Sequence, residues 1–244
     1  MNYRIVGYIF FLICCCVGCQ SIKVDKSTMH TAVKNPIAPG LIGVQKNGMY
    51  ASEFQASAIP EYKKRIRVNA TRVDFSQTTF KAYLNVSKGN KQQIKYVDSL
   101  ESKPRFMTFE LLDRVTILSE LQKEYNVEAL TYIKNQKEAS IVTSISLAIP
   151  ESLMQEIEQA EAVFIGSGAY KQYELSLIKD GRKYKEIDFS STTIFAYGLS
   201  FFCWGENDRR QIMLADIIGE KSSCPKNAYR DAEKATAKMN YFKL

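Results

Sequence analysis

The longest run of apolar and β-branched side chains extends over residues 187–204 and predicts one long strand. Side chains alternate between the two faces of a strand, so this segment has two distinct faces. One carries Phe195, Tyr197, Leu199, Phe201 and Cys203, and the other Ile194, Ala196, Gly198, Ser200, Phe202 and Trp204. Both faces are largely apolar, which predicts a central strand covered on both sides. If one side proves exposed, we expect Phe202 and Trp204 to anchor a partner.

The first half of this strand repeats an earlier stretch of the chain. Aligned without gaps, residues 73–83 and 187–197 share seven identities in eleven positions, in the pattern Asp-Phe-Ser, Thr-Thr and Ala-Tyr. We interpret the repeat as an internal duplication in which each half, 49–126 and 127–244, contributes a β-meander with one copy. The alternative is chance similarity, because strands draw on a small set of residue types.

Shorter alternating runs predict further strands, several of them joined as antiparallel hairpins. They cover residues 63–75, 79–86, 93–97, 105–111, 128–134, 139–149, 162–165, 170–178, 183–189 and 211–218. The clearest hairpin turns at Asp180-Gly181, because this pair readily supplies the positive φ angles of a tight turn. Residues 208–217 also fit a helix, and residues 50–60 fit neither structure clearly.

Three helices complete the prediction. Asp113 fits the N-cap of a helix whose apolar face carries Val115, Leu118, Leu121 and Tyr125. Pro150 fits the first turn of a second helix, whose apolar face carries Leu153, Met154, Ile157 and Ala160. A charged, alanine-rich stretch at 227–239 predicts the third. The expected fold class is α+β, a largely antiparallel β-sheet with about three helices.

A short apolar run follows Arg4 and ends in small residues before a cysteine. At about 13 residues, this run is too short to span a bilayer stably. It ends in the sequence Cys16-Val17-Gly18-Cys19. These residues resemble a bacterial lipoprotein signal, although Cys16 stands where that family usually has Leu. The resemblance covers about the first 20 residues. It implies a signal peptide at 1–18 and a lipidated Cys19, with a plain signal peptide or a short uncleaved anchor as the alternative.

The same resemblance implies where the mature protein lies. In enterobacterial lipoproteins a residue other than Asp after the lipidated cysteine implies sorting to the outer membrane, and Gln20 follows Cys19 here. Residues 21–26 do not resemble acidic surface-export tags, so we expect the periplasmic face. Residues 19–48 lack a sustained period and contain Pro36 and Pro39, which predicts a flexible tether before a globular domain at 49–244.

Composition and charge limit the kinds of partner that the protein is expected to bind. The chain has 244 residues and is 45% apolar, which is enough for a packed core. Without Arg4 it has 32 basic and 26 acidic side chains, a net charge of +6. This excess favours anionic envelope partners, with Lys63, Lys64 and Arg65 as a candidate contact patch. As an alternative, the excess of positive charge serves only to keep the protein soluble. The patch is then the solvent-exposed face of a strand. The expected compartment disfavours nucleic acid.

The cysteines predict a disulfide bond rather than a reactive site. Cys203 and Cys224 are the two that remain in the folded domain, and in an oxidising periplasm they pair most simply with each other. A catalytic thiol at Cys203 has no histidine in the domain to activate it. Two cysteines without histidine do not make a zinc site either. We therefore expect no metal and no cofactor.

Two carboxylates occupy matching positions in the repeat. Asp74 and Asp188 could form a pair of the kind that cleaves glycosides, but each precedes Phe-Ser and then Thr-Thr, which favours a turn-forming role. His30, the only histidine, lies in the expected tether, where we expect it to face solvent. Gly166-Ser167-Gly168 lacks the residues of a phosphate-binding loop and predicts a turn.

No complete catalytic set emerges from these residues, so we favour a non-enzymatic function. The expected protein is anchored in the outer membrane by lipid and binds another envelope protein or an anionic envelope component, in an assembly or scaffolding role. The alternatives are a periplasmic hydrolase that uses carboxylates on cell-wall or glycan substrates, and a carrier for a lipid or glycan.

Overall fold

The computed structural model describes residues 21–32, 37–47, 52–87, 94, 103–189 and 192–241. These residues contain twelve strands, all in one sheet, and five α-helices. The strands are β1 (Ser21–Val24), β2 (Ser27–Thr31), β3 (Ile42–Asn47), β4 (Ser52–Ala58), β5 (Ile66–Asp74), β6 (Arg105–Leu111), β7 (Ala139–Ala148), β8 (Ala162–Ser167), β9 (Tyr173–Lys179), β10 (Arg182–Asp188), β11 (Thr193–Glu206) and β12 (Ile212–Gly219). The helices are α2 (Gln77–Val86), α3 (Arg114–Leu121), α4 (Val127–Asn135), α5 (Glu151–Gln159) and α6 (Ala232–Tyr241), with 3₁₀ turns η2 (Glu124–Asn126) and η3 (Ala169–Lys171). The largely antiparallel sheet is confirmed, with more helices than expected.

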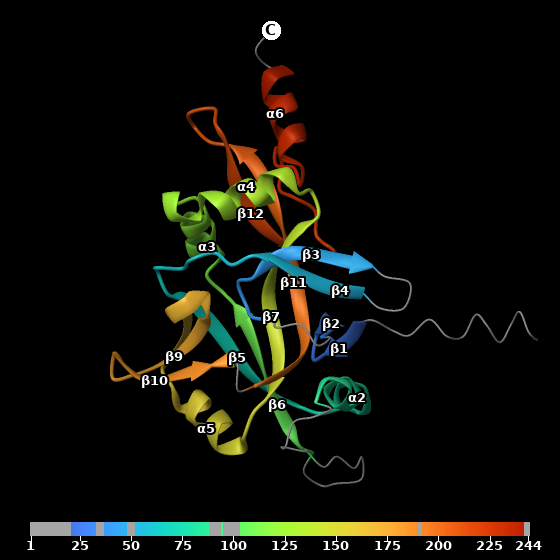
Figure 1. Ribbon diagram of the computed structural model, residues 1–244, viewed down its shortest axis with the longest axis vertical. Helices are drawn as coiled ribbons and strands as arrows, with labels where there is room; N and C mark the ends of the chain where they lie inside the picture. The colour runs from blue at the N-terminus through green and yellow to red at the C-terminus, as the bar shows by residue number, and fades with distance from the viewer. Residues whose placement is uncertain are drawn as a thin grey trace, which may run out of the picture.

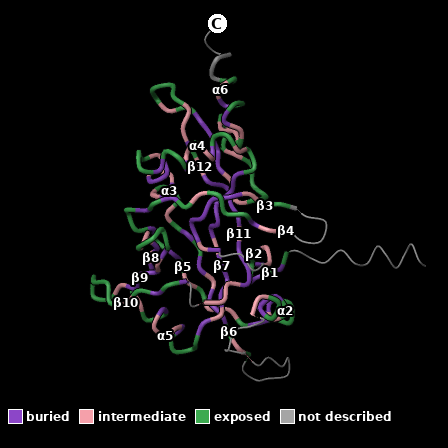
Figure 2. The backbone as a smooth tube through the Cα atoms, in the orientation of Figure 1, coloured by how far each residue is buried: buried purple, intermediate pink, exposed green. Residues whose placement is uncertain are grey.

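The long strand predicted from the sequence is the centre of this sheet. β11 pairs with β7 along one edge and with β2 and β12 along the other. Most of its residues are buried, as the two apolar faces predicted. The strand prediction for 211–218 also holds over the helix alternative, because β12 returns antiparallel to β11. Figure 2 shows the buried residues following β7 and β11 through the middle of the molecule.

The sheet is strongly curled. Its main path runs β1-β2-β11-β7-β6-β5-β8-β9-β10, so six strand spacings separate β11 from β10. In a flat sheet that distance is about 28 Å. The chain passes from Asp188 at the end of β10 to Thr193 at the start of β11 in five steps, which reach at most about 18 Å. The sheet must therefore bend around the core, as Figure 1 shows.

Two segments expected as strands are helices. Residues 79–86 lie in α2, which begins after a capping box in which the Ser76 hydroxyl accepts from the Thr79 amide and the Thr79 hydroxyl accepts from the Ser76 amide. Residues 128–134 lie in α4, which buries Ala129 and Ile133 four positions apart. Both segments fit the alternation of a strand as well as the spacing of an amphipathic helix, and in the structure their buried residues follow the helical spacing.

The two copies of the repeat differ in structure but touch each other. In the first copy β5 ends at Asp74 and the rest is helical, whereas the second copy continues into β11. The Phe75 ring centroid lies 5.6 Å from that of Phe195, and the Tyr83 centroid lies 6.2 Å from it. The expected strand in the first copy is wrong, and the duplication itself stays a prediction. The expected strand at 93–97 lies outside the described residues, apart from Ile94.

The N-terminal residues expected as a flexible tether belong to the sheet instead. β1 and β2 form a hairpin that buries Ile22, Val24 and Met29, and β2 pairs with β11. β3 pairs with both β4 and β7. The alternation of Ile22 and Val24 with polar residues is a strand pattern too short to stand out in the sequence. Cys19 and Gln20 lie outside the described residues.

The core divides into two apolar clusters. The larger surrounds β7 and extends under α3, α4 and α5. The smaller lies beneath β1, β2 and α2 and contains the aromatic rings of Phe75, Tyr83, Phe106 and Phe195. None of the helices in the described ranges is long and apolar enough to span a membrane.

Candidate binding hollow

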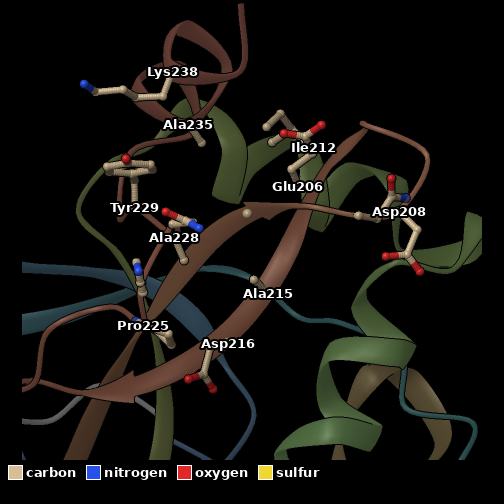
Figure 3. A pocket seen from close by; sticks show the side chains of 14 residues that line it. Glu206, Asp208, Ile212, Ala215, Asp216, Pro225, Ala228, Tyr229, Ala235 and Lys238 are labelled. Atoms are coloured by element: carbon tan, nitrogen blue, oxygen red, sulfur yellow. The ribbon is translucent and has the colours of Figure 1, made fainter. Parts of the chain in front are cut away.

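A hollow of about 580 Å³ opens at the end of the molecule where β11 and β12 project beyond β7. Its walls are the β11–β12 hairpin, the segment at 225–229 and one face of α6. Figure 3 shows Ala215 on the hairpin, Ala228 and Tyr229 on the segment that crosses it, and Ala235 on the helix. It is lined by Gly205, Glu206, Asn207, Asp208, Ile212, Ala215, Asp216, Pro225, Lys226, Asn227, Ala228, Tyr229, Ala235 and Lys238.

Small residues at the contact between these elements leave the hollow open. The register of β12 shifts so that Cys203 lies opposite Asp216 and Trp204 opposite Leu214, which leaves Ala215 as a bulge. A Cβ on Gly205 would lie 3.0 Å from the Ala215 Cβ and 3.8 Å from the Ala228 Cβ. The hairpin and the crossing segment can therefore meet here because Gly205 has no side chain.

The crossing segment is fastened to β11 at two places. Cys203 and Cys224 form a disulfide with their Cα atoms 5.7 Å apart, which confirms the predicted pair. Five residues later, the Trp204 amide donates to the Tyr229 carbonyl at 2.7 Å and the Tyr229 amide donates to the Trp204 carbonyl at 2.8 Å. One wall of the hollow is thus held by a covalent bond and a pair of backbone hydrogen bonds.

The helix that forms the other wall begins at a charged cap. The Asp231 carboxylate accepts from the Glu233 amide at 2.9 Å, and Lys137 lies 2.7 Å from its other oxygen. The hydrogen bond from Lys137 lowers the pKa of Asp231 below its ordinary value. Ala232 and Ala235 are buried on the inner face of the helix. The predicted C-terminal helix is confirmed, with its start at Ala232 rather than near Asn227.

The hairpin turn at the rim is held by one asparagine. The Asn207 side-chain oxygen accepts from the Arg209 amide at 3.0 Å and from the Gln211 amide at 2.9 Å. The backbone N–H of Asn207 also donates to the backbone carbonyl of Gln211 at 3.0 Å. Side-chain bonds of this kind fix a turn. The adjacent carboxylates of Glu206 and Asp208 are therefore presented on a well-held loop.

The lining of the hollow combines both charges with one aromatic ring. Glu206, Asp208 and Asp216 supply three carboxylates, and Lys226 and Lys238 supply two ammonium groups. This set suits a partner that carries both charges, such as a polar peptide segment, because each sign finds its complement. Across the part of the chain that the structure describes, no group of three or more His, Cys, Asp or Glu residues could hold a metal ion.

Phe202 and Trp204, named above as partner anchors if exposed, belong to the core. Each is 3% exposed, and both pack in the larger apolar cluster. The condition for their role as anchors is not met, because both faces of β11 are covered. Trp204 contributes to the hollow only through its backbone bridge to Tyr229.

The basic patch lies apart from the hollow lining, before β5. The side chains of Lys63, Lys64 and Arg65 are exposed. The Lys63 and Lys64 amides donate to the Glu120 carboxylate at 2.7 and 3.1 Å, and the Lys63 ammonium lies 4.1 Å from the centre of the Tyr125 ring. The backbone of the patch is therefore fixed against the end of α3, which leaves the cationic side chains on a rigid surface.

Glu120 is a buried charged residue that the sequence pattern did not reveal. It is 1% exposed and occupies the buried face of α3 with Ile117 and Leu121. Besides the two backbone amides, its carboxylate accepts from the Tyr125 hydroxyl at 2.8 Å. The sequence signal that could have indicated this buried charge is the position of Glu120 directly before Leu121, at the end of an apolar helix face. The predicted face of α3 was partly wrong, because Val115 is 77% exposed.

The remaining candidate residues lie on separate elements. Asp74 lies opposite Arg105 on β6, whereas Asp188 lies opposite Glu174 on β9, so the strands β8 and β9 separate the two in the sheet order. His30 lies in β2 rather than in a tether; its ring stacks on Tyr197 with centroids 5.5 Å apart. The His30 Nε2 atom lies 3.0 Å from the Glu220 carboxylate. Cys19 lies outside the described residues.

Comparison of the chain with protein-family models, curated proteins and solved structures gives no match. The functional argument therefore rests on the geometry and chemistry of this chain. The hollow combines volume, a preformed wall and several kinds of polar group. These properties make it the candidate binding site.

Proposed function

We propose that this protein is a lipid-anchored envelope protein that binds another envelope component through the hollow at its C-terminal end. The observation that carries the proposal is the Cys203–Cys224 disulfide, because it fastens one wall of the hollow. Disulfides persist in oxidising compartments, so this bond supports export from the cytoplasm. It agrees with the signal layout at residues 1–18 and with lipidation at Cys19, on the periplasmic face of the outer membrane.

A preformed wall favours binding because less freedom is lost when the partner arrives. Both the disulfide and the Trp204–Tyr229 bridge hold the crossing segment before any partner is bound. The mixed charges of the lining favour a polar segment of another envelope protein, with acidic groups placed near Lys226 or Lys238 and basic groups near Asp208 or Asp216. The role is one of assembly or scaffolding.

The direct test is to fill the hollow without disturbing the core. Ala215 is exposed on β12, and Ala56 is an exposed alanine on β4, so Ala215→Trp and Ala56→Trp are matched substitutions in strands. Tagged full-length protein is extracted gently from its own membranes, and the co-purifying proteins are identified by mass spectrometry. We expect a partner that is retained by the wild type and by Ala56→Trp and is lost from Ala215→Trp. A partner set that is the same for all three proteins would exclude the hollow as the binding site.

A second candidate function follows from the three carboxylates in the lining. Glu206, Asp208 and Asp216 line the hollow together with Tyr229, and a site that combines carboxylates with an aromatic ring suits a glycan substrate. A periplasmic glycan hydrolase would release products from purified cell-wall glycan, and Asp216→Asn or Glu206→Gln would reduce that activity. If the wild-type protein releases no products, the hydrolase function is rejected and the binding function stays as the proposal. A glycan or lipid found bound in native mass spectrometry would instead support a carrier.

A further inference from the structure

The sheet begins immediately after the proposed lipidation site. β1 starts at Ser21, two residues beyond Cys19, and two residues span at most about 7 Å. Ser21 lies opposite His30 on β2, and His30 lies opposite Tyr197 on β11. The start of β1 is therefore part of the folded sheet. A lipid on Cys19 would hold this end of β1 close to the bilayer surface rather than on a long tether.

The helix α2 lies beside β1 and shares its core. Ile22 and Val24 on β1 pack in the same apolar cluster as Ala82 and Tyr83 on α2. Figure 1 shows the helix next to the β1–β2 hairpin. Because β1 and α2 are packed together, an anchor at the start of β1 also keeps α2 near the membrane.

The exposed side chains of this unit suit an anionic membrane surface. Lys23 on β1, Lys26 in the turn and Lys81 on α2 are exposed, and Asp25 is the single acidic residue of the hairpin turn. Leu84, one turn beyond Lys81, is 43% exposed. Lysines attract anionic headgroups, and an apolar side chain among them can enter the interface. Lys23 alternates with Ile22 and Val24, which share a cluster with α2, so Lys23 lies on the other side of the β1 edge from Lys81 and Leu84. The edge of the unit therefore carries cationic groups on both sides and an apolar side chain on α2, close to the anchor.

We infer that the edge of the molecule formed by β1 at the end of the sheet, the Asp25-Lys26 turn and the adjoining side of α2 lies against the headgroups of the bilayer that holds the Cys19 lipid. This inference rests on the proposed lipid anchor. The occupant of this surface is the anionic lipid of that bilayer. Figure 1 places α2 in the lower part of the molecule and α6 at its upper end, so contact through α2 leaves the α6 end, where the hollow lies, free of the contact.

The experiment places one probe on the contact surface and one on a remote helix. Leu84→Cys on α2 and Val115→Cys on α3 are introduced separately; Val115 is 77% exposed. In the mature protein the proposed lipid occupies Cys19 and the disulfide occupies Cys203 and Cys224, so the new thiol is unique. Each lipidated full-length variant is labelled with a fluorophore and reconstituted in vesicles of phosphatidylethanolamine and phosphatidylglycerol.

Lipids with headgroup nitroxides and aqueous iodide then report the position of each label. We expect nitroxide lipids to quench the label at residue 84 several-fold more than the label at residue 115, and iodide to show the opposite order. Adding Lys23→Glu and Lys81→Glu should reduce the nitroxide quenching at residue 84. Adding Lys171→Glu, a remote exposed lysine in η3, should leave it unchanged.

Flotation of the vesicles separates the two ways in which the inference can fail. Protein that floats with the vesicles while iodide quenches both labels equally has its anchor but stands off the membrane, which overturns the inference and leaves the proposed anchor intact. Protein that does not float, and whose mass shows no lipid, overturns the proposed anchor, and the contact surface is rejected with it. Flotation with selective nitroxide quenching at residue 84 supports both.

Discussion

The Tyr125 hydroxyl donates a 2.8 Å hydrogen bond to the carboxylate of Glu120, which is almost completely buried. The same carboxylate accepts from the Lys63 and Lys64 amides. A single glutamate thus joins η2, the end of α3 and the segment before β5. Because a buried carboxylate is stable only when it is well hydrogen-bonded, this arrangement makes the stability of the region depend on one side chain.

Glu120→Gln should destabilise the protein by about 2 kcal/mol, because three hydrogen bonds lose a charged acceptor and the new amide hydrogens need acceptors of their own. Chemical denaturation of both proteins measures the change in the free energy of unfolding. Glu124→Gln is the matched control, since Glu124 is exposed one turn away and should change stability by no more than about 0.5 kcal/mol. Equal stability of the two variants would contradict a structural role for the Glu120 carboxylate.

The same pair predicts a loss of stability at alkaline pH. Tyr125 is 39% exposed, but partial loss of water around its hydroxyl raises its pKa, and the hydrogen bond to Glu120 raises that pKa further, from 10.0 to about 12. The folded protein therefore keeps this proton over a pH range in which the unfolded chain releases it. The contribution of Tyr125 is complete below pH 10 and is lost as the pH rises to about 12.

Tyr125→Phe tests this pH dependence. Between pH 10 and about 12, the free energy of unfolding of the variant should fall less steeply than that of the wild type, because the variant lacks this titrating group. Denaturation curves at a series of pH values measure both slopes. Tyr184→Phe is the control, since Tyr184 is exposed on β10 and its hydroxyl donates to the Glu156 carbonyl rather than to a carboxylate. Parallel curves for wild type and Tyr125→Phe would refute the prediction.

Removing the disulfide should destabilise the protein by about 3 kcal/mol, because the bond closes a loop of about 20 residues in the unfolded chain. The bond joins Cys203 and Cys224, which are 21 positions apart. Thermal or chemical unfolding of a variant with both cysteines changed to serine measures the loss. A reducing agent should lower the stability of the wild type toward that of the variant and leave the variant unchanged. A wild type that is unaffected by complete reduction would show that the bond contributes little.

Phe195→Ala should destabilise the protein by about 3 to 5 kcal/mol, because it leaves a cavity in the smaller apolar cluster. Phe195 is fully buried, and its ring centroid lies 5.0 Å from that of Phe106 and 5.6 Å from that of Phe75. Phe164→Ala provides the comparison, since Phe164 is partly exposed on β8 and should lose less stability. Equal losses in chemical denaturation would argue against tight packing between the two copies of the repeat.

Strands and hairpins with strong local signals were predictable from the sequence. Residues 105–111 form β6 with the expected bounds, and the hairpin at Asp180-Gly181 has φ angles of 50° and 68° at these two residues. The helix expected at Pro150 is α5, although Pro150 is its N-cap rather than part of its first turn. In each case a turn residue, a proline or a sustained alternation restricts the local backbone, so no distant contact is needed to decide the structure.

The misses share a physical cause, since distant contacts decided each of them. Residues 79–86 and 128–134 fit both the two-residue period of a strand and the 3.6-residue period of a helix. Packing against the sheet selected the helix. β1 has only four residues, and its partners include a strand from the other end of the chain. The hollow depends on the approach of Ala228 to Gly205, which no local pattern encodes. Cys203 and Cys224 were predictable because few pairings were available.

The pairing of His30 with Tyr197 has a consequence for how the chain acquires its structure. These partners are separated by 167 positions in sequence, so closing the sheet at this edge carries the entropy of a very long loop. In a chain that crosses a membrane with its N-terminus leading, β2 has no partner on β11 until the C-terminal third has followed. In the export that we propose, the protein should therefore remain extended until late and fold slowly, which keeps it in the threadable state that translocation requires.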